Sequence, residues 1–121
     1  MGDRLEWAAG RVGLALLFFA GAVQKGLNPD PAQALLMDVG LPGWLVWPAL
    51  LFNAGAAILL ALNRFVRPTA RALAAYCVVT SVFHFVPDDP WQMSIMVKNW
   101  AIAGGCLALS VASASHSRLA S

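Results

Sequence analysis

Apolar residues along this chain gather into four long segments separated by short polar ones. The segments cover about residues 7–25, 41–62, 69–86 and 93–114, and the second holds 22 residues without a formal charge. About 20 consecutive apolar residues form a helix that crosses a hydrocarbon core of about 30 Å. The pattern therefore predicts an all-α integral membrane protein, a bundle of four transmembrane helices.

The loop after the first segment predicts one further helix. Asp30 is a typical N-cap residue, Pro31 suits the first helical position, and Gly40 is a typical C-terminal stop. These signals favour a short helix at about 31–39, whose leucines and valine share one face. We expect this helix in the first outer loop, lying in the membrane interface or across the mouth of the bundle.

The first segment has the apolar length of a signal peptide and is followed by small residues. Its leading region, however, contains Asp3 and Glu6 as well as Arg4. We therefore expect a retained helix, and a single membrane domain that covers residues 1–121.

Composition excludes several classes of protein. Apolar residues make up 60% of the chain and charged residues only 12%, about half the usual share of charge in soluble domains. A net charge of +2 without a basic run argues against nucleic acid as a partner. The lipid bilayer is the partner that this composition requires.

Lysine and arginine are distributed unevenly between the two sides of the predicted bundle. Only Lys25 and Lys98 lie on the side of the short helix. Basic residues mark the cytoplasmic side of a membrane protein, so both termini are expected in the cytoplasm. The six arginines that define this side are Arg4, Arg11, Arg64, Arg67, Arg71 and Arg118.

Four polar residues fall within roughly one helical turn of the outer boundary: Lys25, His84, Lys98 and Asn99. Two interpretations remain open. In the first, both lysines extend outward to water and His84 only hydrogen-bonds a neighbouring helix. In the second, the four line an outward-opening pocket that binds and protonates an anionic or quinone-like ligand, near the outer aspartates Asp38, Asp88 and Asp89.

Asn53, Cys77 and Cys106 are expected near the membrane midplane. Small and polar residues recur around both cysteines at helical spacing, which is typical of close helix packing. The two thiols are either an inert buried pair or a redox pair, depending on the rotation of their helices. With a single histidine inside the membrane, the sequence predicts no metal site.

The order of these features resembles the DoxX family of small four-helix membrane proteins of bacteria and archaea. The resemblance covers about residues 5–112, and Lys98-Asn99 followed by Gly104-Gly105 is its most specific part. The motifs that carry it are Gly21 to Lys25, Gly40-Leu-Pro42, the Arg-rich link 63–71, a histidine near the end of the third span, and 96–105.

The resemblance implies a bacterial or archaeal cell membrane and a role beside redox enzymes. Members are similar to the membrane subunit of a thiosulfate:quinone oxidoreductase, and others are linked to thiol or quinone redox stress. Lys25, Lys98, Asn99 and the Gly104-Gly105 pair correspond to recurring family positions. Family members often carry a glutamate where this chain has Asn53, a departure that removes a titratable group from the midplane.

We therefore expect a small membrane subunit of a quinone- or thiol-linked redox complex. It has no complete catalytic machinery of its own and assembles as a homo-oligomer or within a larger complex. Its cofactor stays open, with a quinone as one candidate. Two alternatives stay open: a non-catalytic scaffold, assembly or chaperone-like subunit, and a binder of lipid or of another small apolar ligand.

Overall fold

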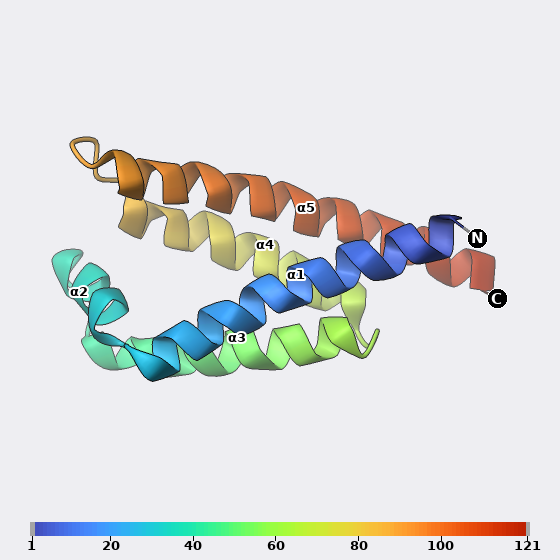
Figure 1. Cartoon of the computed structure of the whole chain (residues 1–121), viewed down its shortest axis with the longest axis horizontal. Coiled ribbons are helices and arrows are strands. Elements are labelled where there is room, and N and C mark those ends of the chain that lie inside the picture. The colour runs from blue at the N-terminus through green and yellow to red at the C-terminus, as the bar shows by residue number, and fades with distance from the viewer. Residues whose placement is uncertain (1, 121) are drawn as a thin grey trace.

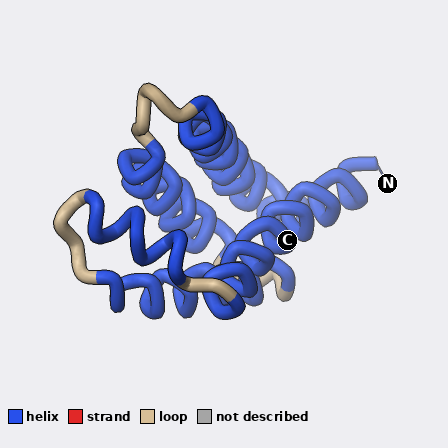
Figure 2. The backbone as a smooth tube through the Cα atoms, turned by 60° about the vertical axis from the view of Figure 1, so that its left-hand side comes forward, coloured by secondary structure: helices blue, strands red, loops and turns tan. Residues whose placement is uncertain are grey.

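The computed structural model describes residues 2–120, with side chains described as far as residue 114. Every regular element in that part of the chain is a helix, which confirms the all-α fold (Figure 2). In order along residues 2–120 the elements are α1 Gly2–Leu27, α2 Asp30–Asp38, η1 Gly43–Leu45, α3 Val46–Ala61, α4 Val66–Thr80, η2 Ser81–His84 and α5 Pro90–Ala120, where η marks a 3₁₀ helix.

Three stretches of the described chain are long and apolar enough to cross a membrane: Gly2–Leu27, Gly43–Ala61 and Pro90–Ala114. They match the first, second and fourth predicted spans. The third predicted span, at about 69–86, is not confirmed as a spanning helix, because α4 ends at Thr80 and continues only as the 3₁₀ helix η2. A four-span bundle is thus not confirmed by helix length alone.

Hydroxyl groups explain why α4 ends where it does. Thr80 Oγ1 donates to the Tyr76 carbonyl oxygen at 2.8 Å, and Ser81 Oγ donates to the Val78 carbonyl oxygen at 2.6 Å. Hydroxyls that bond back along their own helix compete with its N–H groups and bend or tighten the helix. The α-helix accordingly gives way to a 3₁₀ turn immediately before His84.

The short helix predicted at 31–39 is present as α2, but the predicted N-cap is wrong. Pro29 occupies that position without a side-chain hydrogen bond, because Asp30 itself already adopts helical geometry. The predicted stop at Gly40 is confirmed. Gly40 has a φ of +83°, its N–H bonds the Met37 carbonyl, and the N–H of Leu41 bonds the Leu36 carbonyl at 2.9 Å, which is a Schellman motif.

Replacing Gly40 with alanine is expected to destabilise the protein by about 1–2 kcal/mol, because L-residues pay that much in the left-handed region. Nothing lies within 4 Å of the added Cβ, so the cost is one of backbone conformation. Thermal unfolding in detergent measures it. Gly104→Ala is the matched control: that site in α5 is equally open but helical, so the same change is expected to be neutral or to stabilise by up to about 1 kcal/mol.

The helices pack as two pairs. α1 lies along α3 and α4 lies along α5, with far less contact between the pairs than within each. Figure 1 shows the pairs approaching one another near the chain termini and diverging toward the end that carries α2. The space between the pairs is therefore widest at the α2 end.

Small side chains fill the core where the pairs meet, with Leu60 and Leu73 fully buried among them. Large apolar side chains such as Leu51 and Val111 instead face outward. This distribution is typical of helices surrounded by lipid, because close helix approach in a membrane depends on small residues. The alanines of the core are Ala15, Ala56, Ala57, Ala70, Ala74 and Ala103.

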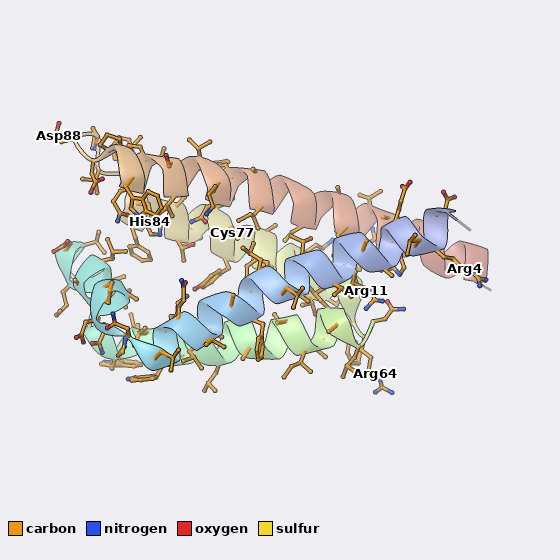
Figure 3. All side chains as sticks on the ribbon, in the orientation of Figure 1. Arg4, Arg11, Arg64, Cys77, His84 and Asp88 are labelled. Carbon is orange, nitrogen blue, oxygen red and sulfur yellow. The ribbon has the colours of Figure 1, made fainter. Side chains whose placement is uncertain are left out.

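Arginine and aspartate side chains lie toward opposite ends of the long axis in Figure 3. It shows Arg4, Arg11 and Arg64 in the half that carries the chain termini, and Asp88 at the opposite end. The guanidinium Nη1 of Arg11 donates to the carbonyl oxygens of Leu60 and Ala61 at 2.5 and 2.8 Å. Arg11 thus binds carbonyls in the last turn of α3, where Leu60 O also accepts the Asn63 N–H at 3.2 Å.

Candidate functional site

A pocket of about 800 Å³ lies between the two helix pairs at the α2 end of the bundle. All five α-helices contribute to its walls, and most of the lining is leucine, isoleucine, alanine and aromatic side chains. This volume falls within the range of small-molecule sites, which are largely apolar with a few convergent polar groups. The polar side chains in the lining are Gln24, Lys25, Asn28, Asn53, Tyr76, Thr80, His84, Gln92, Lys98 and Asn99.

The helix α2 forms part of the pocket wall through Leu35 and Leu36. These two leucines belong to the apolar face that the sequence predicted. This face was expected either in the membrane interface or across the mouth of the bundle, and in the structure it contacts the mouth of the bundle. Whether α2 also lies in the membrane interface stays a prediction.

The structure brings together the polar residues that were expected at two separate depths. The outer group of Lys25, His84, Lys98 and Asn99 lines the pocket, and so do Asn53 and Cys77 from the midplane group: these six residues share one cavity. Cys106 does not reach it. The outer aspartates Asp38, Asp88 and Asp89 were expected near this cluster, but none of them lines the pocket.

Asn53 brings an incompletely satisfied amide to the pocket. Its side chain is only 2% exposed. Asn53 Nδ2 lies 3.4 Å from the Tyr76 hydroxyl oxygen, while Oδ1 has no hydrogen-bond partner among the described residues. Turning the amide would exchange the two atoms without supplying a second partner. Since a buried polar group without a partner costs about 1–3 kcal/mol, this amide is a natural ligand contact.

Lys25 is directed into the pocket. Its Nζ lies 3.8 Å from the point that a Cβ at Gly21 would occupy, and Asn53 Nδ2 lies 4.0 Å from the same point. Helical side chains incline toward the N-terminus of their helix, so the ammonium group reaches back over Gly21, away from the outer end of α1. Lys25 thus lines the pocket, and the interpretation in which its ammonium group reaches water at the outer boundary stays a prediction.

His84 is held at the pocket mouth by the neighbouring helix. Its Nδ1 lies 2.7 Å from Gln92 Oε1, and Gln92 is in the first turn of α5. Because an amide oxygen only accepts, Nδ1 carries the proton and Nε2 is left for another partner. His84 thus both hydrogen-bonds a neighbouring helix, as one interpretation had it, and lines the pocket.

Asp89 fixes the start of α5 and hence the position of Gln92. Its Oδ1 accepts from the backbone N–H groups of Trp91 at 3.0 Å and Gln92 at 3.3 Å, which makes Asp89 an N-cap. Neither this role of Asp89 nor the contribution of Gln92 is among the features predicted from the sequence. The pair Asp89-Pro90 is a typical helix start and could have revealed the cap. Nothing in the sequence marks Gln92 as the partner of His84.

Both cysteines are free and buried. They belong to one apolar cluster of α4 and α5 together with Ala74 and Ala103, and Cys77 alone of the two reaches the pocket. Figure 3 shows Cys77 on α4 and His84 at the end of η2, with His84 closer to the end that carries Asp88. No group of three or more His, Cys, Asp or Glu side chains that could hold a metal ion occurs in the described part of the chain.

Comparison with known proteins identifies one family. A sequence model of the DoxX family matches residues 7–85. The match covers α1 to η2 and ends before Lys98, Asn99 and the Gly104-Gly105 pair, so the segment that seemed most specific to the family lies outside it. No curated protein and no solved structure matches the chain.

Proposed function

This chain belongs to the DoxX family of membrane proteins, and on that premise we propose that it is a ligand-binding membrane subunit of a quinone- or thiol-linked redox complex. It is a small multi-pass membrane protein, and its ligand is an amphiphilic molecule of the quinone type held between the helix pairs. One observation carries the proposal: Lys25 and the incompletely paired amide of Asn53 converge at one end of a largely apolar pocket.

The pocket residues suit the two parts of a quinone. A quinone carbonyl oxygen is a hydrogen-bond acceptor, and both the Lys25 ammonium and the Asn53 amide N–H are donors. Phe18 and Tyr76 supply aromatic walls, and His84, whose Nδ1 is held by Gln92, keeps Nε2 as a further hydrogen-bonding group. A bound quinone would supply the electron-transfer chemistry, while the chain binds and orients it.

We further propose that α4 and η2 together form a fourth span. Fifteen α-helical and four 3₁₀ residues reach about 30 Å, because a 3₁₀ helix rises about 2.0 Å per residue against 1.5 Å in an α-helix. That length equals the hydrocarbon thickness of a typical bilayer. In this topology both termini lie on the cytoplasmic side of a bacterial or archaeal cell membrane, and the pocket opens to the outer side.

Binding of a decyl-substituted benzoquinone to the chain in neutral lipid nanodiscs tests the proposal. We expect saturable binding that weakens about three- to tenfold in His84→Ala and in Lys98→Ala, because each change removes one polar contact. Arg64→Ala, exposed at the opposite end of the bundle, is the control and keeps full affinity. Absence of saturable binding at any concentration would remove this function and leave the scaffold or assembly subunit as the surviving alternative.

A further inference from the structure

The pocket contains positive charge without a counter-ion. Lys25 and Lys98 both line it, and no aspartate or glutamate is among its described lining residues. No described residue forms an ion pair or a hydrogen bond with the Lys25 ammonium. An unpaired charge inside a membrane protein is expensive, and such groups ordinarily have a partner. The partner of Lys25 is therefore to be sought in what the pocket binds.

The position of the ammonium group strengthens this point. Lys25 could lower its energy by extending toward the outer end of α1, as lysines near helix ends usually do. Instead its Nζ lies over Gly21, where the missing side chain leaves room, and the incompletely paired amide of Asn53 is adjacent. Two donors thus face the same small volume: the Lys25 ammonium group and Asn53 Nδ2, which has a second N–H besides the one directed at Tyr76.

Most of the remaining lining is apolar, although polar side chains such as His84, Gln92 and Asn99 also reach the cavity. Leu17, Phe18 and Ile102 line it beside the Lys25–Asn53 end, and Leu35 and Leu36 of α2 close the other side. A free inorganic anion would leave most of the 800 Å³ without suitable contacts. A hydrocarbon tail would fill that space and bring its head group to Lys25.

We infer that the pocket selects an amphiphile with an acidic head group, a carboxylate or a phosphate ester, which acts as the counter-ion of Lys25 with Asn53 as its second contact. This inference rests on the proposed function, because it concerns the ligand of the same pocket. It goes beyond that function by assigning a negative charge to the head group. A quinone, which is neutral, satisfies the hydrogen bonds of this end but leaves the ammonium charge uncompensated.

Decanoate and decanol separate the two possibilities, since they share a chain and differ in charge. Binding is measured at pH 8 with the full chain in nanodiscs of zwitterionic phosphatidylcholine, with empty nanodiscs subtracted. We expect decanoate to bind at least about tenfold more tightly than decanol. Lys25→Met is expected to remove that advantage without weakening decanol, and Lys25→Arg to retain it. Thermal unfolding confirms that each variant is folded.

A second variant keeps the test independent of the lysine itself. A Cβ at Gly21 would meet Lys25 Nζ and Asn53 Nδ2 at ordinary contact distances, so Gly21→Val is expected to fold. Its two additional methyl groups occupy the space of the head group, and decanoate binding is expected to fall at least about tenfold. Lys98→Gln, which removes an exposed lining cation, is expected to have a smaller effect.

Equal affinity for decanoate and decanol, unchanged in Lys25→Met, would overturn the acidic head group while leaving the pocket as a binding site. If decanoate, decanol and the benzoquinone all fail to bind, the proposed function fails with it. Competition by inorganic phosphate at a concentration equal to that of decanoate would identify a free-anion site and overturn the amphiphile. Failure of phosphate to compete, together with the charge preference, supports the inference.

Discussion

Replacing Ala49 with tryptophan is expected to abolish ligand binding, with a loss of at least about a hundredfold in affinity, while the protein stays folded. Ala49 lies on α3 and lines the pocket. An indole ring placed there occupies space that the ligand needs. Binding would then require the ring or the ligand to be displaced, which costs several kcal/mol. The cavity of about 800 Å³ is large enough to accept the ring without displacing helices.

Leu51→Trp is the matched control for this change. It introduces the same side chain on the same helix, but Leu51 is 70% exposed on the outer face. Affinity is measured with the decyl benzoquinone and with decanoate, and folding by thermal unfolding. Retained binding in Ala49→Trp would show that the ligand lies elsewhere, and equal loss in Leu51→Trp would show a general effect of tryptophan on the bundle.

Arg11→Ala is expected to lower the free energy of unfolding by about 2–4 kcal/mol. The guanidinium donates to two carbonyls at the C-terminal end of α3 and lies 6.0 Å from the centre of the Trp7 ring. Alanine leaves both carbonyls without that donor and detaches the middle of α1 from the end of α3. Unfolding in mixed detergent micelles measures the change.

Two further variants serve as controls for Arg11→Ala. Arg4→Ala removes an equal charge from an exposed position on the same helix and is expected to change stability by less than about 0.5 kcal/mol. Arg11→Lys keeps the charge but loses the planar fork of donors, so an intermediate loss is expected. Equal stability of Arg11→Ala and Arg4→Ala would contradict the assigned contact.

The hydrophobic pattern predicted most of the helices well, because a helix that crosses a membrane needs a long run of apolar residues. The apolar segments became α1, η1 with α3, and α5, and the predicted interior stripe of α5 is buried at Ala103, Cys106 and Ser110. The failures are local. The hydroxyls of Thr80 and Ser81 convert the end of the third segment to a 3₁₀ helix, and no periodicity shows such back-bonding.

Candidate polar residues were found because polar groups are rare and costly in apolar segments. Depth along each helix was enough to select Lys25, His84, Lys98 and Asn99, but not to show that Asn53 and Cys77 share their cavity. The sequence gives the depth of a residue in the membrane. Its position around the helix axis, and the spacing of the two helix pairs, are known only from the folded chain. For the same reason the partnership of His84 with Gln92 required the folded chain.

Native mass spectrometry of the chain, extracted gently from its own membrane without added ligand, shows whether the pocket is occupied. We expect one amphiphile retained per chain, with an acidic or quinone head group in the extracted material, and its loss in Ala49→Trp. A wild-type chain without adduct, or an adduct that Ala49→Trp retains equally, would contradict the assignment of the pocket as a ligand site.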